Sequence, residues 1–296
     1  MWGGVGRQRP SASFQDSGQI GPNSGNDVDL RRLSIAQLSA HLDAVPALES
    51  SVLRALRRDP RRGVRQLASR LRARQDRLLR ETARLADLFA TEQDQRRLGF
   101  TAIAGVDEVG VAPLAGPVVA AAVILLPDVH LPELNDSKQL TPEQREELYP
   151  QIMAAARAVH VGMAGVEEID RLNILQATRL AHRRAIMGLT VRPQMILIDG
   201  RFPADVPMPQ LVVIDGDATC ASIAAASVVA KVTRDRLMTT LDERYPPYGF
   251  AKHKGYGTKQ HLNAIRRHGL TPLHRRSFLT VRAFQEPLLA VGGISG

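Results

Sequence analysis

A long apolar segment near the middle of the chain, residues 104–126, is interrupted by two adjacent acids, Asp107 and Glu108, and by a turn containing Gly and Pro. Residues 100–106 have the composition of a strand, and residues 118–126, rich in Val and Ala, predict its hairpin partner. This segment constrains the fold most, because two strands would hold a carboxylate pair in fixed geometry beside loops that admit a substrate. An ordinary polar turn is the alternative interpretation.

The rest of the chain after this hairpin alternates between strand and helix patterns. Further strands are predicted at residues 159–166, 195–198 and 211–214, and further helices from Thr141 and Pro142, over residues 167–189 as two consecutive helices, over 219–241 and around 261–268. This order predicts an α/β fold in which a mixed sheet is flanked by helices.

Four acids leave three of the predicted strands: Asp107, Glu108, Asp199 and Asp217. If these strands are parallel neighbours, the acids converge at the carboxyl edge of the sheet, where open sheets bind ligands. Several ionised carboxylates repel one another strongly unless cations neutralise them. Oxygen ligands without a Cys or His motif suit Mg²⁺ or Mn²⁺, and two such ions support phosphodiester hydrolysis. The pattern therefore favours a metal-dependent nuclease, with magnesium-dependent phosphotransferases as an alternative.

The formal net charge is +9 and the sequence pI about 10.4, which suits a polyanionic partner such as nucleic acid. Arginine is concentrated between Arg54 and Arg84, although biased amino-acid usage is an alternative explanation for that cluster. The single cysteine, Cys220, excludes an intrachain disulfide and a cysteine-cluster metal site. Because no run approaches the length of a membrane span and no signal-peptide core is visible, we expect a soluble, cytoplasmic protein with no membrane partner.

The chain before the sheet has two parts. Residues 1–29, rich in Gly, Ser, Asn, Gln and Pro, predict a disordered tail. Residues 30–92 predict a helical N-terminal extension, with one short helix capped by Ser34 and one long helix after Pro60. The long helix carries a heptad-spaced apolar stripe made of Val64, Leu67, Leu71, Leu78, Leu85 and Leu88 and interrupted by Arg74 and Glu81.

The stripe requires a partner surface, which is the main domain, the preceding helices or another protein. Its opposite, Arg-rich face meets phosphates or solvent, and we favour a module that adds affinity for nucleic acid. Because the stripe is short and interrupted, we expect a monomer. Residues 93–285 are predicted to form the main domain and residues 286–296 a C-terminal tail.

Many separate segments of the main domain resemble bacterial ribonuclease HII, the type 2 ribonuclease H. They include AGVDEVG, PLAGPVVAAAVIL, LNDSKQLT, SIAAASVVAKVTRDRLM, HKGYGT and HRRSF, in the order and spacing of the family, over about residues 100–284. The preceding helical segment is similar to the N-terminal extension of some members. The resemblance implies a ribonuclease H-like fold, hydrolysis of the RNA strand of RNA–DNA hybrids, and incision at ribonucleotides embedded in duplex DNA, leaving 3′-hydroxyl and 5′-phosphate ends.

Carried over position by position, the resemblance makes Asp107, Glu108, Asp199 and Asp217 the catalytic, metal-binding acids, which are the acids that the strand pattern also selects. Asp215 is interpreted as a loop charge. Tyr256, in HKGYGT, matches a tyrosine that stacks on the sugar near the ribose–deoxyribose junction, where the 2′-hydroxyl must be sensed. Packing within its loop is the alternative role for this tyrosine.

Several other residues are assigned more weakly. The candidate phosphate contacts, each with a surface-charge alternative, are Lys138, Lys231, Arg234, Lys252 and Lys254. For His253 and His274 we favour structural roles over proton transfer. Ser222 and Ser227 are expected to pack under the site, and Cys220 is given no chemistry.

The chain differs from the family in the motif that binds the nucleotide next to the scissile phosphate. Where the family usually has Gly-Arg-Gly, this chain has Gly110, Val111 and Ala112. Val111 offers no cation to a phosphate, and Ala112 puts a methyl group where glycine would allow close approach or a positive φ. Losing a charge-assisted phosphate interaction costs about 1.5 to 3 kcal/mol, so we expect altered recognition, especially of single ribonucleotides, with metal binding retained.

Two other functions are compatible with parts of the pattern. The first is an RNA–DNA hybrid-binding protein with weak or lost cleavage, which the change at Val111 and Ala112 would motivate. The second is a related metal nuclease, such as a junction resolvase, against which HKGYGT and SIAAAS argue. The intact set of four acids favours the enzyme, because a pure binding protein gains nothing from a repulsive acidic cluster.

Overall fold

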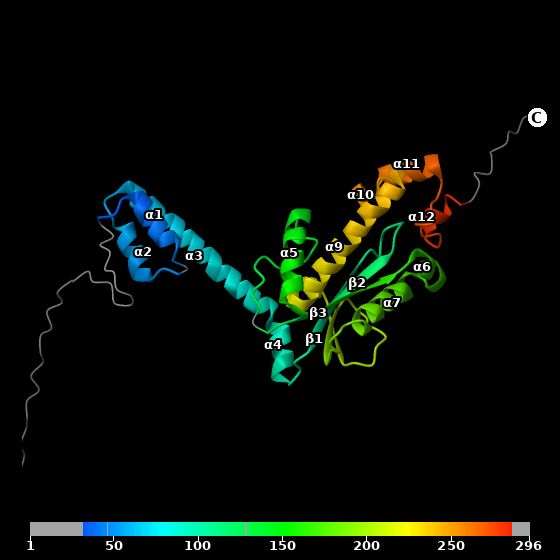
Figure 1. The fold of residues 1–296 in the computed structure, drawn as a ribbon, viewed down its shortest axis with the longest axis horizontal. Coiled ribbons are helices and arrows are strands. Elements are labelled where there is room, and N and C mark those ends of the chain that lie inside the picture. The colour runs from blue at the N-terminus through cyan, green and yellow to red at the C-terminus, as the bar shows by residue number, and fades with distance from the viewer. Residues whose placement is uncertain (1–31, 46, 128, 286–296) are drawn as a thin grey trace, which may run out of the picture. The chain divides into compact units, whose positions relative to one another are not determined.

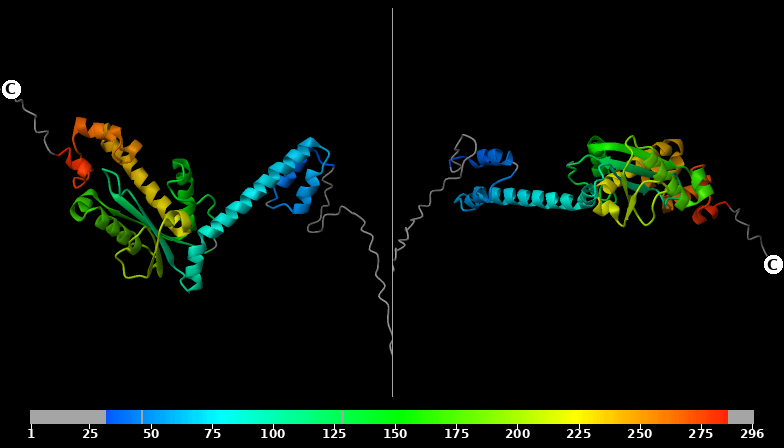
Figure 2. Two further views of the ribbon diagram at one scale, coloured as in Figure 1. Left: turned by 180° about the vertical axis from the view of Figure 1, so that it is seen from behind. Right: turned by 90° about the horizontal axis from the view of Figure 1, so that it is seen from below.

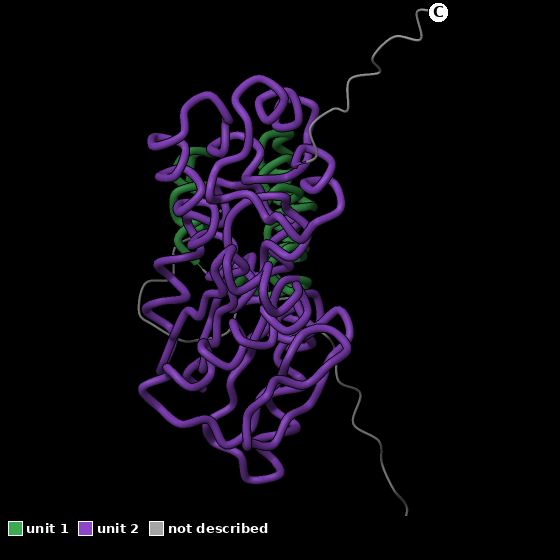
Figure 3. The backbone as a smooth tube through the Cα atoms, turned by 90° about the vertical axis from the view of Figure 1, so that its right-hand side faces the viewer, with its two compact units in different colours: residues 1–80 green, residues 81–296 purple. Residues whose placement is uncertain are grey.

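The structure, a computed structural model, describes residues 32–45, 47–127 and 129–285 (Figure 1). The predicted tails at residues 1–29 and 286–296 lie outside the described residues. The chain divides into two compact units, residues 1–80 and 81–296 (Figure 3). This division falls inside helix α3 (Arg62–Leu88), earlier than the boundary expected at residue 92, and the assignment of functional domains stays a prediction. Within the described ranges, no helix has the length and apolar character needed to cross a membrane.

The first unit is a helical module, which we define as residues 32–80. Helix α1 (Ile35–Asp43) begins where Ser34 Oγ accepts the Gln37 N–H, as its sequence predicts, and α2 (Ser50–Arg57) follows. These helices and the first part of α3 enclose a small apolar core that includes Leu38, Leu42, Leu56, Val64, Leu67 and Leu71. The module thus has a core of its own.

The apolar stripe of α3 is not one continuous seam. Val64, Leu67 and Leu71 lie in the core of the module, and Leu78 is 48% exposed. Further along the same helix, Leu85 and Leu88 are buried in the core of the second unit. The helix therefore serves two cores that the heptad pattern alone did not separate.

The second unit is built on a five-stranded sheet in the order β3-β2-β1-β4-β5. Its strands are β1 (Ile103–Val109), β2 (Val118–Leu125), β3 (Ala156–Ala164), β4 (Met195–Asp199) and β5 (Gln210–Val213). The pairs β1–β2 and β2–β3 are antiparallel, whereas β1–β4 and β4–β5 are parallel. The predicted hairpin and the mixed sheet are confirmed.

Helices cover both faces of this sheet (Figures 1 and 2), with α5 and α9 on one face and α6 and α7 on the other. The helices of this unit after α3 are α4 (Ala90–Arg97), α5 (Pro142–Ala155), α6 (Val166–Leu172), α7 (Ile174–Met187), α8 (Gly216–Thr219), α9 (Ala221–Arg244), the 3₁₀ turn η1 (Pro246–Tyr248), α10 (Phe250–His253), α11 (Lys259–His268) and α12 (Leu279–Arg282). Along β2, Ala121 and Val123 pack toward α9, whereas Ala120 and Ala122 pack toward α7. Successive side chains of a strand point to opposite faces, which explains why β2 is apolar throughout.

Helix α9 touches β1 directly. A Cβ atom at Gly105 would lie 2.0 Å from the carbonyl carbon of Ser222, so only glycine lets the first turn of α9 reach the strand. The contact lies two residues before Asp107 in the chain. It fixes the helix beside the acidic end of β1.

Candidate active site

The four predicted acids are brought to one edge of the sheet. Asp107 and Glu108 lie inside β1, which extends to Val109 and not only to residue 106 as expected. Asp199 is the last residue of β4, the parallel neighbour of β1, and Asp217 lies in α8 just after β5. The parallel pairing therefore gathers acids that are as much as 110 positions apart in the sequence.

The two acids of β1 face opposite sides of the sheet, because adjacent strand residues alternate. Asp107 faces α9, where Ser227 hydrogen-bonds its carboxylate, and its Oδ1 also accepts the Glu108 N–H at 2.7 Å. Glu108 faces α7, where His182 Nε2 lies 2.8 Å from its Oε2. Each carboxylate is thus oriented by a separate helix.

The electrostatics of these acids show that they interact. Burial raises the pKa of Asp107 well above its usual value, and the charges of Glu108 and Asp199 raise it further, opposed by the hydrogen bond from Ser227. Burial also raises the pKa of Asp199, as do the charges of Asp217 and Glu108, although the Gly216 N–H donates to Asp199 Oδ1 at 2.7 Å. Mutual charge repulsion is what a cation would relieve.

Lys138 compensates part of this negative charge. Its Nζ donates to Asp217 Oδ2 at 2.7 Å, and this hydrogen bond and the charge of Asp217 raise the pKa of the ammonium. The Lys138 side chain is 77% exposed, whereas that of Asp217 is 6% exposed, so the lysine reaches the acid from the solvent side. A candidate phosphate contact therefore also pairs with one of the four acids.

The fit of the donor set to a divalent cation rests on its chemistry. Among the described residues, no three His, Cys, Asp or Glu side chains already surround a common position for a metal ion. Two of the acids are instead engaged by protein groups, Glu108 by His182 and Asp217 by Lys138. The set nevertheless fits, because the four carboxylates offer the hard oxygen ligands that Mg²⁺ and Mn²⁺ prefer, and a cation would relieve the charge repulsion that adds to burial in raising the pKa of Asp107 and Asp199.

The loop after β1 replaces the expected Gly-Arg-Gly motif. Gly110 has a φ of +91°, and a Cβ there would lie 2.3 Å from Arg234 Nε, so glycine is required. Val111 is 38% exposed and Ala112 is exposed as well. The φ of Ala112 is not positive, so its methyl group causes no backbone strain, and altered recognition stays a prediction.

Arg234 does not take the position expected of a phosphate contact. It is fully buried, and its guanidinium donates to the carbonyls of Pro117 at 3.0 Å, Lys254 at 3.0 Å and Ala115 at 3.2 Å. Burial lowers its pKa. The arginine therefore ties the loop after β1 to the loop that carries Lys254, and the expectation of a surface contact was wrong because local sequence does not report burial.

The remaining candidate substrate contacts lie at or near the surface. Tyr256 is 42% exposed, and its carbonyl oxygen lies 2.9 Å from His261 Nδ1. Lys231 pairs with Asp235 at 2.8 Å, and Lys254 Nζ donates to Thr239 Oγ1 at 2.9 Å. The side chains that also remain accessible are those of Lys252 and the loop acid Asp215.

Comparison with known proteins places this geometry in a family. The sequence model described as Ribonuclease HII matches residues 104–281, and the model described as Ribonuclease HII N-terminal domain matches residues 34–96. The chain belongs to the ribonuclease HII family. Members of this family cleave the RNA of RNA–DNA hybrids, and the chain is accordingly a ribonuclease H enzyme.

Relatives named Ribonuclease HII are similar over most of the chain. The protein from Desulfitobacterium hafniense (strain DSM 10664 / DCB-2) is 50% identical over 253 residues, covering 86% of this chain and 96% of the relative. The protein from Geobacillus kaustophilus (strain HTA426) is 48% identical over the same shares of the two chains. The match therefore includes the helical module as well as the sheet.

Solved structures agree with the fold. The crystal structure of the ribonuclease H2 from Pyrococcus horikoshii OT3 has a TM-score of 0.52 and 27% identity, covering 62% of this chain and 96% of that one. The crystal structure of Bst-RNase HIII in complex with Mn²⁺ has a TM-score of 0.50 and 20% identity, covering 62% and 69%. The predicted ribonuclease H-like fold is confirmed.

Three residues of this ribonuclease HII site were missed by sequence reasoning. His182 on α7 is 5% exposed and orients Glu108. Arg275, in HRRSF, is fully buried and donates to the carbonyls of Gly110 at 2.5 Å, Val111 at 2.8 Å and Gly116 at 2.9 Å. The recognised HRRSF segment was the one available signal for Arg275, and nothing in the local pattern marked His182.

Glu92 is the third. It lies in the polar helix α4 and yet is only 1% exposed. Its Oε1 accepts the Ser222 N–H at 2.6 Å and the Cys220 thiol at 3.1 Å, and so caps the start of α9. Because that first helical turn touches β1 at Gly105, Glu92 supports the acidic strand from behind.

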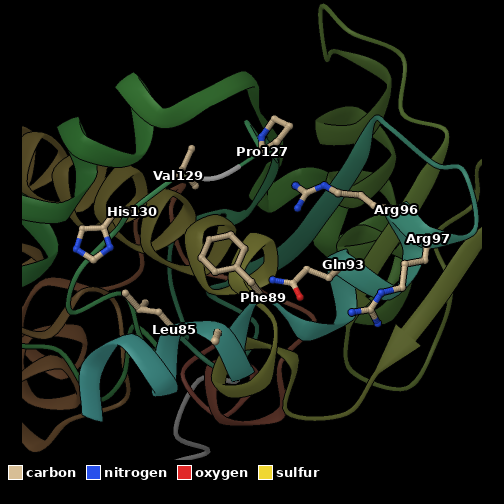
Figure 4. A pocket seen from close by; sticks show the side chains of 9 residues that line it. Leu85, Phe89, Gln93, Arg96, Arg97, Pro127, Val129 and His130 are labelled. Carbon is tan, nitrogen blue, oxygen red and sulfur yellow. The ribbon is translucent and has the colours of Figure 1, made fainter. Parts of the chain in front are cut away.

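The expected structural histidines and serines are buried. His253 and His274 are hydrogen-bonded to the backbone, and Ser222 and Ser227 lie inside α9 under the acids. A separate cavity of about 500 Å³ is lined by residues that include Leu85, Phe89, Arg96, Arg97, Val129 and His130 (Figure 4). None of the four acids lines this cavity, so it is not part of the candidate active site.

Proposed function

We propose that the chain is a divalent-metal-dependent endonuclease that cleaves the RNA strand of RNA–DNA hybrids and incises at ribonucleotides embedded in duplex DNA, leaving 3′-hydroxyl and 5′-phosphate ends. The observation that carries the proposal is the set of four carboxylates at one sheet edge, whose charges raise the pKa of Asp107 and Asp199. Because the apolar stripe of α3 is divided between two cores, we further infer that the enzyme acts as a monomer. We also propose that it acts in the cytoplasm.

Asp107, Glu108, Asp199 and Asp217 would hold Mg²⁺ or Mn²⁺. Bound there, divalent ions supply activation of the attacking water and neutralisation of the charge that develops on the phosphate and the leaving oxygen. A two-metal arrangement suits four carboxylates, since each ion removes repulsion between the acids that bind it.

The chain's own groups orient these acids and the substrate. The Glu108 N–H and Ser227 fix the carboxylate of Asp107, and the Gly216 N–H fixes Asp199. Fixed carboxylates lose little entropy when a ligand binds, which favours a site of defined geometry.

Two exposed side chains are proposed to contact the substrate directly. Lys138, on the solvent side of Asp217, exchanges its ion pair for a phosphate oxygen near the acids. The accessible ring of Tyr256 stacks on the sugar beside the ribonucleotide. Lys231 and Lys254 add weaker phosphate contacts, since each is paired within the protein and is less exposed than Lys138.

The loop that begins at Gly110 approaches the same nucleotide through its exposed residues Val111 and Ala112. Val111 and Ala112 add no cation there. Recognition of a single ribonucleotide therefore rests on the backbone and on Tyr256 more than it would with an arginine at position 111. This is where we expect the enzyme to differ from relatives that have the Gly-Arg-Gly motif.

The test is cleavage of end-labelled duplexes, either RNA–DNA hybrids or DNA with one ribonucleotide, in the presence of Mg²⁺ or Mn²⁺. We expect incision of both, and a loss on the order of 10³-fold in Asp217→Asn, since charge stabilisation by a metal is worth several kcal/mol. Asp215→Asn is the matched control: this acid lies two positions away, is exposed and should be dispensable. No cleavage by the unaltered chain, combined with tight hybrid binding, would identify a binding protein instead.

A further inference from the structure

The net charge of the chain is concentrated in one unit. Residues 1–80 contain 15 arginines and seven acids, a net charge of +8, whereas residues 81–296 carry only +1. The unit that contains the candidate active site is therefore nearly neutral. The part of the affinity for a polyanion that depends on long-range charge must therefore come mainly from the helical module.

Eight arginines of the module fall into two groups that differ in their partners. In the first group, acids of the module neutralise the side chains: Asp43 pairs with Arg70 at 2.7 Å and approaches Arg74 at 3.9 Å, and Asp76 pairs with Arg72 at 3.6 Å. Similarly, Arg61 pairs with Asp59 at 2.9 Å. These arginines are therefore already engaged in ion pairs within the module.

The second group, which we call the open arginine face, consists of Arg54, Arg57, Arg58 and Arg62. All four are exposed, and within the described part of the chain none forms an ion pair with an acid. Arg54, Arg57 and Arg58 have the i, i+3, i+4 spacing that puts side chains on one face of α2, and Arg62 opens α3 four residues later. Like charges on one helix face repel one another unless an anionic partner neutralises them.

The chemistry of this face favours nucleic acid. Guanidinium groups bind phosphate oxygens in a planar, bidentate geometry, and a row of them neutralises successive phosphates. A membrane surface fits less well, because insertion requires an exposed apolar face, whereas Leu56 of α2 is buried and Leu53 packs against the core of the module. A duplex backbone requires no such apolar face.

We propose that Arg54, Arg57, Arg58 and Arg62 bind the phosphate backbone of duplex nucleic acid outside the active site and supply most of the salt-dependent affinity of the enzyme. The interaction is independent of sequence and of sugar type, since it involves phosphates only. It deepens the proposed function and rests on it only for the choice of a duplex as partner. Removal of these arginines should raise the KM for duplex substrates and leave kcat almost unchanged.

The test compares two full-length variants with the same loss of charge. One is Arg54→Gln, Arg57→Gln, Arg58→Gln and Arg62→Gln combined; the control combines Arg65→Gln, Arg70→Gln, Arg72→Gln and Arg74→Gln, which removes arginines that already bond within the module. Glutamine preserves helix propensity, and circular dichroism checks folding. Binding of a DNA duplex of about 30 base pairs is measured in an Asp217→Asn background from about 50 to 200 mM salt, the range over which phosphate binding weakens steeply.

We expect the open-face variant to bind on the order of 100-fold more weakly at about 100 mM salt and its log K against log salt slope to shrink by about 3, near 0.9 for each phosphate that the protein no longer neutralises. The control should change several-fold less. Equal losses in the two variants, or an unchanged slope in the open-face variant, would overturn the proposal. So would binding to anionic phosphatidylserine vesicles that depends on these arginines while duplex binding does not.

Cleavage separates this result from the proposed function. In the Asp217-containing chain, the open-face variant should show a KM at least about tenfold higher with kcat within about twofold. If the unaltered chain failed to cleave any duplex, the proposed function would fail while the binding comparison would still decide the role of the arginines. A kcat that falls as much as kcat/KM would show that the arginines act in the active site, contrary to the proposal.

Discussion

Arginine has opposite roles in the two units of this ribonuclease HII. In the helical module it is exposed, and Arg54, Arg57 and Arg58 have no acidic partner within the described residues. In the second unit Arg234 and Arg275 are both fully buried, and again no described acid forms an ion pair with them. An arginine without an acidic partner is therefore accessible to a ligand in the helical module, whereas in the second unit it is buried and stabilises the fold.

Backbone carbonyls explain how the buried pair is tolerated. Arg234 and Arg275 each donate to three carbonyl oxygens, and together they hold the loop that follows β1. Burial and the charge of Arg234 lower the pKa of Arg275 to about 9, which leaves it protonated at neutral pH. The comparison shows that charge alone does not identify a substrate contact; the accessibility of the guanidinium decides.

The largest predicted effect is on stability and separates the two arginine types. Arg275→Lys should lower the free energy of unfolding by about 2 to 4 kcal/mol, because one ammonium cannot satisfy three buried carbonyls in the geometry of a guanidinium. Arg57→Lys in the module should change it by less than about 0.5 kcal/mol, as is typical of exposed positions. Urea unfolding of the two variants checks this, and similar losses in both would refute the distinction.

The positions of the four acids and of the exposed arginines could be predicted from sequence, whereas the burial of Arg234 and Arg275 could not. The four acids were found because local patterns place them at or just after predicted strands, and the parallel pairing of β1 with β4 was the condition for their convergence. Arg234 looked like a surface cation because its helix, SIAAASVVAKVTRDRLM, becomes charged at that point. Its burial depends on carbonyls at Ala115 and Pro117, which lie 119 and 117 positions away and which local periodicity does not record.

The burial of Glu92 could not be predicted from sequence for the same reason. Its segment is polar, but the carboxylate is buried because it accepts the Ser222 N–H from 130 positions later in the chain. Lys138 and His182 likewise acquire their partners only when the sheet assembles. Sequence patterns therefore located the chemistry of the site, whereas its supporting contacts required the tertiary fold.

Two buried histidines of the second unit, His261 and His274, are held in their neutral form. The Thr271 N–H donates to His274 Nδ1 at 2.9 Å, so His274 Nε2 carries the proton toward His261 Nε2 at 3.0 Å, and His261 Nδ1–H donates to the Tyr256 carbonyl at 2.9 Å. Every link in this chain requires neutral rings. Burial lowers the pKa of both histidines from 6.5 to about 4.

The sign of the pH effect follows from these values. Because the folded-state pKa lies below that of the unfolded chain, the stabilisation is complete above about pH 6.5 and is lost as the pH falls toward 4. We expect the free energy of unfolding to fall by about 2 kcal/mol for each of the two histidines between about pH 7 and pH 4.5, and by clearly less in total in His274→Gln. Urea titrations at both pH values test this; an undiminished loss in the variant would assign the dependence to other groups.

The smallest predicted effect comes from giving the loop after β1 an exposed arginine at position 111. Val111 is exposed, so Val111→Arg combined with Ala112→Gly can present a guanidinium to a phosphate without displacing any buried group. One charge-assisted interaction of about 1.5 kcal/mol should raise kcat/KM about tenfold on a duplex with one ribonucleotide. Ala112→Gly alone is the control and should change little, because the φ of Ala112 is not positive. An unchanged rate in the double variant would mean that the backbone at Gly110, held by Arg275, already supplies all the recognition at this position.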